Sequence, residues 1–162
     1  MITLRFAQKE DLKTIHLLAH STWWFAYENI LPSEQIKIML DEFYTEEALQ
    51  SQINNGHRFI IAEEEGNPLG FSSYSETENP VIIKIHKLYI DPKAQGKGIG
   101  KHLVNKVSQI AQAEGASVLE LFVNRNNPAL SFYEKVGFKI VKAIDTPYHE
   151  YVLDDYILHK SL

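Results

Sequence analysis

The sequence predicts one α/β domain of the α+β type that spans residues 1–162. The chain has 162 residues, of which 44% are hydrophobic, and a chain of this size buries enough surface for a single core. Segments with strand-like alternation and segments with helical spacing are mixed along it. No internal repeat, low-complexity segment or Ser/Gly/Pro-rich linker separates them, so all of them are expected to pack in one fold.

The first half is expected to form a strand, three helices and a β-hairpin. The expected elements are strand 2–6, helix 11–26, two shorter helices that begin at Ser33 and Thr45, and strands 58–63 and 69–75. Ser and Thr are residue types that cap helix N-termini. The segment 66–68, which reads Gly-Asn-Pro, is expected to contain the turn of the hairpin.

The expected strand 81–90 changes the phase of its alternation partway along. Apolar residues stand at odd positions through Ile85 and at even positions from Leu88 to Ile90. One extra residue near Lys87, a β-bulge, explains the change and leaves a backbone N–H free for a ligand. Burial of both strand faces beyond residue 87 explains the same pattern, and the sequence leaves both interpretations open.

A glycine-rich loop follows this strand and leads into a helix expected over residues 99–114. The segment 95–101 reads Gln-Gly-Lys-Gly-Ile-Gly-Lys. Free N–H groups at a helix N-terminus, with lysines beside them, favour a bound phosphate. The spacing excludes a Walker A loop, because His102 stands where Ser or Thr is needed. It also excludes a dinucleotide loop, because Lys101 stands where a third glycine is needed.

A second motif follows the apolar strand expected at 118–123. Asn126 or Asn127 can cap the next helix, and Pro128 suits its first turn because the missing N–H costs nothing there. Gly137 ends that helix. The chain therefore runs from strand to asparagine-rich cap to helix to returning strand.

Composition excludes several classes of function. The chain has no Cys, which excludes disulfide scaffolds and cysteine nucleophiles, and its histidines show no metal-ligand spacing, so we expect no metal. Residues 1–80 carry 5 basic and 13 acidic side chains, and residues 81–162 carry 11 and 8. An acidic chain without a basic, aromatic stripe is not expected to bind nucleic acid. No signal peptide or membrane-spanning stretch is apparent, so we expect a cytoplasmic protein without a membrane partner.

From about residue 81 to residue 138 these motifs resemble the GCN5-related N-acetyltransferase (GNAT) family, and the whole chain does so more loosely. The segments 23–27 and 155–160 look most like the polyamine (spermidine/spermine) acetyltransferase branch. The resemblance implies a mixed, mainly antiparallel sheet of six to seven strands with helices on both faces. It also implies that two central strands splay apart at one end, where the cosubstrate acetyl-CoA binds.

The resemblance further implies which residues hold acetyl-CoA. The backbone of Leu88 to Ile90 would run beside the pantetheine arm, and the glycine loop would hold the pyrophosphate. The implied residues are Leu88, Tyr89, Ile90, Gln95, Gly96, Lys97, Gly98, Ile99, Gly100, Lys101, Asn124, Asn126, Tyr133 and Lys135.

Three catalytic roles are expected around this loop. An amine must lose a proton before it attacks a thioester, and His86 is a candidate base because the reference pKa of histidine is about 6.5. Lys84 stands where many family members have a glutamate that acts as base, so a carboxylate or a water chain stays open for this role. A backbone N–H at Leu88 would stabilise the oxyanion. Tyr133 matches the family's general acid for the departing thiolate. Tyr133 also fits an apolar helix stripe and His86 a solvated strand face, so a structural role for each stays open.

Aromatic and acidic residues suggest the acceptor site. Trp23, Trp24, Tyr27 and Glu28 lie together near the end of the first expected helix, and aromatic faces beside carboxylates suit alkylammonium ions. A core tryptophan with acids on exposed helices explains them equally well.

The expected function is acetyl-CoA-dependent N-acetyltransfer to the primary amine of a small cationic acceptor, such as a polyamine. Acetylation of a protein or peptide amine, and a non-catalytic CoA-binding regulatory module, are the alternatives. The apolar segment 148–162 suits either an internal strand or an edge strand that joins two copies in a homodimer.

Overall fold

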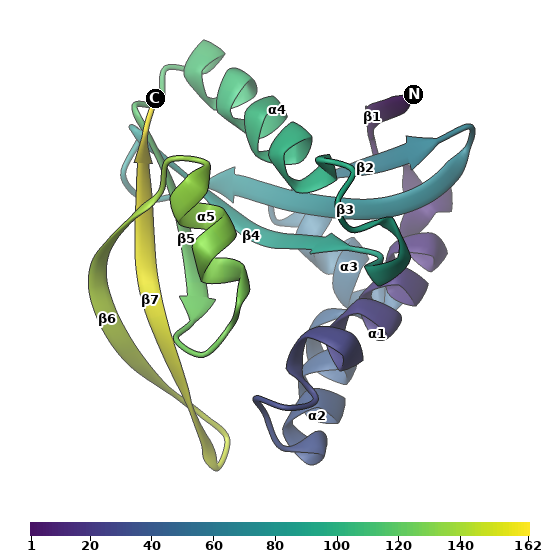
Figure 1. Cartoon of the computed structure of the whole chain (residues 1–162), viewed down its shortest axis with the longest axis vertical. Coiled ribbons are helices and arrows are strands. Elements are labelled where there is room, and N and C mark those ends of the chain that lie inside the picture. The colour runs from purple at the N-terminus through teal and green to yellow at the C-terminus, as the bar shows by residue number, and fades with distance from the viewer.

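Seven strands form one mixed sheet in the computed structural model, which describes residues 1–162 (Figure 1). The strands are β1 (Ile2–Phe6), β2 (Arg58–Glu64), β3 (Asn67–Glu76), β4 (Ile82–Ile90), β5 (Val118–Asn124), β6 (Lys139–Tyr148) and β7 (Tyr151–Ser161). They lie in the order β1-β2-β3-β4-β5-β7-β6. Every neighbouring pair is antiparallel except β4 and β5, which confirms the predicted mixed, mainly antiparallel sheet.

Helices cover both faces of this sheet, as predicted. They are α1 (Leu12–Tyr27), α2 (Ser33–Phe43), α3 (Glu46–Asn54), α4 (Ile99–Ala113) and α5 (Ala129–Lys135), with short 3-10 turns η1 (Lys9–Asp11) and η2 (Pro92–Ala94). Phe59 and Ile61 of β2 pack under α1, α2 and α3, whereas Ile60 and Ala62 pack with α4 and α5. Period-2 alternation therefore divides the apolar residues between two cores. None of the helices combines the length and apolar character needed to span a membrane.

Two of the predicted local signals are wrong in detail. Thr45 caps α3 as predicted, by accepting a hydrogen bond from the N–H of Ala48 at 3.1 Å. Ser33, however, is the first residue of α2, and the N-cap position is Pro32, whose backbone is extended. The hairpin turn consists of Glu65 and Gly66, both with positive φ. The residues after them already belong to β3, because a two-residue turn with positive φ matches the twist of the paired strands.

Of the two interpretations of the phase change in β4, the structure shows the β-bulge. Ser73 of β3 pairs with Lys87, but the next residue, Tyr74, pairs with Ile85, so His86 is the extra residue. The C-terminal strand β7 is internal, between β5 and β6, and β6 is the edge strand of the sheet. Pairing with β6 on one side and β5 on the other uses the main-chain groups of β7 within the chain.

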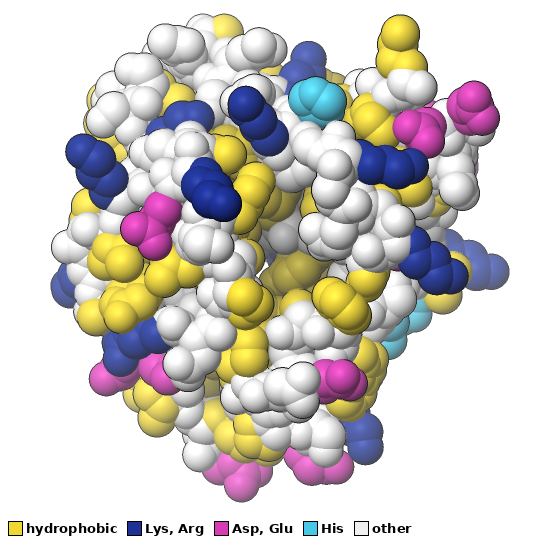
Figure 2. Space-filling view, viewed as in Figure 1, with side chains coloured by type: hydrophobic (Ala, Val, Ile, Leu, Met, Phe, Trp, Pro, Cys, Tyr) yellow, Lys and Arg dark blue, Asp and Glu magenta, His cyan; other side chains and the backbone are white.

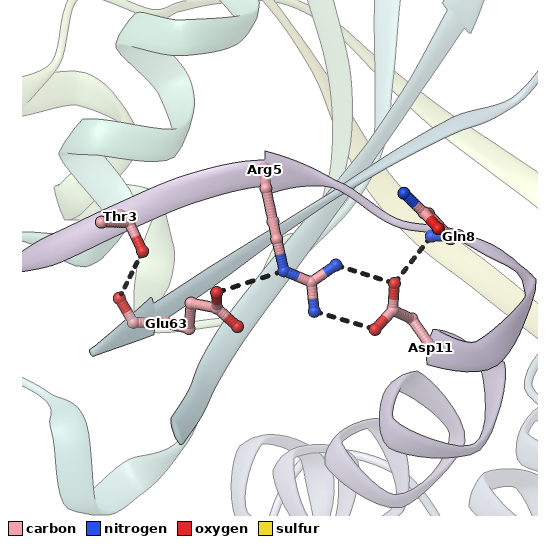
Figure 3. Close-up of polar contacts among 5 residues, drawn as sticks. All are labelled: Thr3, Arg5, Gln8, Asp11 and Glu63. Atoms are coloured by element: carbon pink, nitrogen blue, oxygen red, sulfur yellow. Dashed lines mark hydrogen bonds and ion pairs between the residues drawn. The ribbon is translucent and has the colours of Figure 1, made fainter. Parts of the chain in front are cut away.

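A charged cluster joins the first strand to the start of the helical layer (Figure 3). The guanidinium of Arg5 on β1 donates to both oxygens of Asp11, at 2.8 and 2.9 Å. It also donates to Glu63 on β2 at 3.2 Å. Asp11 in turn accepts the backbone N–H of Gln8, and the Arg5 guanidinium lowers the pKa of this carboxyl. The bidentate geometry ties the turn before α1 to the sheet edge.

A single lysine is buried in the core beneath α1 to α3. Lys87 is 8% exposed, and its ammonium lies 5.1 Å from the ring centroid of Tyr44 and 6.0 Å from that of Phe59. It forms no ion pair or hydrogen bond within the chain. Burial, followed by the charge of Lys84, lowers the pKa of Lys87 to about 8. A buried ammonium without a partner is costly to desolvate.

Replacement of this lysine should therefore stabilise the protein. Lys87→Met is expected to raise the free energy of unfolding at pH 7 by about 2 kcal/mol, because it removes the buried charge and keeps the volume. The folded protein releases the Lys87 proton at a lower pH than the unfolded chain. The free energy of unfolding of the wild type should therefore rise relative to that of the variant as pH rises from about 8 to 10. Urea unfolding of both proteins at several pH values measures this. A variant that is less stable than wild type at pH 7 would contradict it.

Candidate active site

The two central strands β4 and β5 separate halfway along. They pair only from Ile82 to Ile85, opposite Val118 to Leu121, although β4 continues to Ile90 and β5 to Asn124. The separation begins where the bulge at His86 turns β4. A gap therefore opens between the two strands in the middle of the sheet.

Backbone groups of β4 face this gap. Leu88, Tyr89 and Ile90 pair with β3 on one side and with no strand on the other. The N–H of Asp91 donates to the carbonyl of Leu69 on β3 at 2.8 Å. In an antiparallel ladder alternate residues point to opposite sides, so Tyr89 bonds to β3 and the N–H and C=O groups of Leu88 and Ile90 point into the gap.

The glycine loop and the start of α4 lie at one end of this gap. Gly98 is the N-cap of α4, with φ +74°, and no side chain caps the helix. A Cβ at Gly98 would meet no atom within 4 Å, whereas one at Gly100 would lie 2.9 Å from the ring of Phe132. The N–H groups of the first turn are therefore open to a ligand, and the helix approaches α5 only because residue 100 is glycine.

A cavity of about 600 Å³ runs through the gap. It is lined by the C-terminal half of α1, the open part of β4, the glycine loop, β5 and α5. Since α1 covers one face of the sheet and α4 and α5 cover the other, the cavity connects the two faces. Figure 2 shows this hollow as an apolar depression with basic side chains near its rim. The size and the open main-chain groups fit a long, phosphorylated ligand such as acetyl-CoA.

Tyr133 lies on α5 and lines the cavity. Asn127 accepts the N–H of Ala129 at 2.9 Å, but the N-cap position of α5 is Pro128 and no side chain caps the helix from there, so the predicted asparagine cap lies one residue before the observed one. The Tyr133 side chain is buried, and its hydroxyl forms no hydrogen bond within the chain. Burial, together with the nearby Tyr27, raises the pKa of Tyr133, so the phenol holds its proton at neutral pH.

Three hydroxyl and amide groups meet beside Tyr133. The hydroxyls of Tyr27 on α1 and Tyr89 on β4 lie 3.1 Å apart, and the amide of Asn127 donates to Tyr27 at 3.4 Å. These bonds connect α1 to the loop before α5, 100 residues later in the chain. Tyr27 therefore helps to hold the wall of the cavity.

His86 lines the cavity in a cation-rich surrounding. Its Nε2 lies 2.6 Å from the hydroxyl of Ser75, and its ring stacks on His57 with centroids 4.1 Å apart. Burial, followed by the charges of His57, Lys84 and Lys87, lowers the pKa of His86 to about 3. The imidazole is therefore neutral and a weak base at neutral pH.

Several residues predicted to bind acetyl-CoA lie outside the cavity. Lys97 reaches Glu64 at 3.3 Å, and Lys135 is exposed at the end of α5. Asn124 accepts the N–H of Asn126 at 2.8 Å and donates to Asp154, so it shapes the loop before α5. The predicted residues that line the cavity are Leu88, Tyr89, Ile90, Gln95, Gly96, Gly98, Ile99, Gly100, Lys101 and Tyr133.

The predicted acceptor cluster at the end of α1 does not form as a group. Trp23 is 5% exposed and belongs to the core beneath α1, because helical spacing places it on the buried stripe. Trp24 and Glu28 do not line the cavity, and Tyr27 does. Phe25, which is 66% exposed, also lines it. The residue that the sequence pattern missed on this helix is therefore Phe25.

Other cavity residues carry weak sequence signals. Phe122 on β5 and Phe132 on α5 line the cavity together with Asn127. An aromatic residue inside an apolar strand or helix is indistinguishable from a core residue until the partner strand is known to diverge. Asn127 had a local signal, since an asparagine before Pro128 is a cap candidate, but its bond to Tyr27 depends on tertiary contact.

Comparisons with known proteins agree with this geometry. Residues 11–138 match the family model of the acetyltransferase (GNAT) family. A solved structure of PaiA N-acetyltransferase from Thermoplasma acidophilum in complex with coenzyme A is 30% identical with a TM-score of 0.84, over 100% of this chain and 99% of that chain. A spermidine N(1)-acetyltransferase from Thermoplasma acidophilum is 31% identical over 145 residues, which are 86% of this chain and 89% of that protein.

A further relative has a different named acceptor. The N-alpha-acetyltransferase RimI from Mycobacterium tuberculosis is 29% identical over 105 residues, which are 62% of this chain and 65% of that protein. The names of these relatives all describe transfer of an acetyl group to nitrogen, but they name different acceptors. The chain belongs to the GCN5-related N-acetyltransferase (GNAT) family and is an acetyl-CoA-dependent N-acetyltransferase.

Proposed function

We propose that this enzyme acetylates a primary amine of a small cationic acceptor, and that the acceptor is a polyamine. The cavity that connects the two faces of the sheet supports this assignment. Its α4 end offers main-chain donors and Lys101, and its α1 end offers the aromatic rings of Phe25, Tyr27 and Phe122. Aromatic faces attract alkylammonium ions. The relative named for spermidine acetylation agrees with this choice of acceptor.

Acetyl-CoA supplies an activated acetyl thioester at this site. The open backbone of Leu88 and Ile90 would pair with the amides of its pantetheine arm, as an added strand pairs with a sheet edge. The free N–H groups at the start of α4 would hold the pyrophosphate. Gln95 and Lys101 border the same end of the cavity, and Lys101 adds positive charge there.

Two groups of the chain would assist acyl transfer. The N–H of Leu88, freed by the bulge, would donate to the oxygen that becomes negative, and such a donor contributes about 3 kcal/mol to the transition state. Tyr133 would donate a proton to the departing sulfur. Because its hydroxyl has no partner within the chain and its pKa is raised, the phenol stays protonated and available.

Deprotonation of the acceptor does not require His86. An imidazole with a pKa of about 3 is poorly matched to an alkylammonium with a pKa near 10. Burial beside Lys84 lowers the pKa of Lys87 to about 8. We assign the same effect to the bound acceptor amine, whose proton is then lost to solvent near neutral pH. In this assignment His86 helps to form the cation-rich wall and remains neutral.

An amine panel tests the proposed acceptor. With saturating acetyl-CoA, spermidine should give a kcat/KM at least about tenfold above that of a peptide N-terminus, because the proposed acceptor end of the cavity is apolar and aromatic. Release of free thiol measures the reaction. Acetylation of the peptide with no turnover of spermidine would support the protein-amine alternative, for which the mycobacterial relative is the precedent.

Tyr133→Phe tests the general acid. The variant should lower kcat by about 100-fold and leave the Kd for coenzyme A nearly unchanged, because the ring still fills the same space. Tyr74→Phe is the matched control, since Tyr74 is buried in the same core with an unpaired hydroxyl and does not line the cavity. Turnover of Tyr133→Phe equal to that of the parent would remove Tyr133 from the mechanism.

Two glycines with positive φ allow an effect on coenzyme A binding to be distinguished from an effect on stability. Gly98 (φ +74°) and Gly115 (φ +91°) flank α4, and a Cβ at either meets no atom within 4 Å. Alanine at each should cost about 1–2 kcal/mol of stability. Only Gly98→Ala should raise the Kd for coenzyme A, by about tenfold, because only that end faces the cavity. Calorimetric titration and thermal unfolding check this; an equal loss of affinity in both variants would contradict it.

A further inference from the structure

One face of β4, β5 and β7 beside the cavity carries charged and aromatic residues. Lys84 on β4 pairs with Glu120 on β5, and alternate residues of a strand share a face. Phe122 and Asn124 therefore lie on the same face as Glu120, opposite to Leu121, which packs with α4 and α5. On β7 the partners of these residues are His159, Ile157 and Asp155. Phe122 is the residue of this face that also lines the cavity.

Asp155 is an unpaired carboxylate on this face. It is partly buried, and its side chain forms no ion pair or hydrogen bond within the chain. Glu120 pairs with His159 at 2.8 Å. Arg125 pairs with Asp145 at 2.7 Å and donates to the backbone carbonyl of Asp155 at 3.2 Å, so no basic side chain forms an ion pair with the Asp155 carboxylate, although the charges of Arg125 and Lys84 act on it. Burial, followed by the charge of Asp154, raises the pKa of Asp155. A bound cation would interact more favourably with this unpaired carboxylate than with one that already forms an ion pair.

Asp155 also lies near the acceptor end of the cavity. Its charge raises the pKa of Tyr27, which lines that end. On β7, Asp155 pairs with Asn124 of β5, which is two residues beyond the cavity residue Phe122. An ammonium at the rim between Phe122 and Tyr27 would therefore meet this carboxylate.

The chain itself already places an ammonium on this surface. The Nζ of Lys84 lies 3.6 Å from the centroid of the Phe122 ring, forms no ion pair within 4 Å, and is partly buried. Burial lowers the pKa of Lys84, and the charges of Glu120 and Asp155 act against this. The Phe122 ring thus accepts a primary ammonium face-on, as in a cation–π contact.

We propose that Asp155, with the face of Phe122, binds a second ammonium of the acceptor, and that Lys84 competes with the acceptor for this place. This assignment rests on the proposed function and narrows it to alkane diamines and polyamines. A monoamine has no second charge for Asp155. An amino acid would bring a carboxylate that Asp155 repels.

Matched acceptors test the assignment in the full-length enzyme with saturating acetyl-CoA. For Asp155→Asn the KM for 1,4-diaminobutane should rise about tenfold or more, and the KM for butylamine should stay unchanged, because only the diamine loses a charged contact. For Lys84→Met the KM for the diamine should fall about threefold, since the competing cation is gone. Glu150→Gln, which removes an exposed carboxylate of the β6–β7 turn, is the charge control and should change neither KM.

Equal changes for both amines in Asp155→Asn, or no change, would overturn the assignment and leave the proposed function standing. If the parent enzyme acetylates neither amine but acetylates a peptide, the proposed function fails. Calorimetric titration of 1,4-diaminobutane into the coenzyme A complex of each protein then decides separately. A roughly tenfold weaker Kd in Asp155→Asn supports the subsite, and a parent enzyme that binds no diamine overturns it.

Discussion

The end of the β4–β5 pairing at Ile85 and Leu121 is the constraint on which the rest of this structure depends. A sheet interior normally uses every main-chain donor and acceptor. The extra residue His86 turns β4 away from β5 and leaves the main-chain groups of Leu88 and Ile90 without a partner strand, in a gap where only the side-chain amide of Gln95 reaches the carbonyl of Ile90, at 3.5 Å. The cavity, the open start of α4 and the position of Tyr133 all border this gap.

Electrostatics at the site differ from what the overall charge suggests. The acidic side chains of residues 1–80 lie mainly on exposed surfaces, whereas the cavity wall holds His86, Lys87 and Lys101 and no carboxylate. Positive charges near the cavity disfavour a further positive charge, and so keep a base such as His86 neutral. This effect is compatible with a reaction whose nucleophile must be a neutral amine. The unpaired carboxylate of Asp155 stands beyond the wall, where a second charge of the acceptor can reach it.

Local signals predicted much of the site, because they depend on neighbouring residues alone. The left-handed backbone at residue 98 favours glycine, and the position of Gly98 between a predicted strand and a predicted helix can be recognised from the sequence. The phase change across residues 85–88 located the bulge for the same reason. For Trp23 the sequence left both a core and an acceptor-site role open, and the structure shows the core role. The cap expected at Ser33 was wrong by one residue, since a cap residue type does not fix where the first turn begins.

The sequence by itself determined the order of strands and helices and the glycine-rich helix start, because hydrophobic period, positive φ and capping are properties of short segments. It offered the bulge as one of two interpretations, and the pairing of β3 with β4 decided between them. The tertiary structure alone decided that Phe25 and Asn127 line one cavity and that Trp23 does not. It also decided that Lys97 reaches Glu64 and that β7 is internal. These outcomes depend on contacts between strands and helices that are far apart in the chain, and local sequence patterns do not predict such contacts.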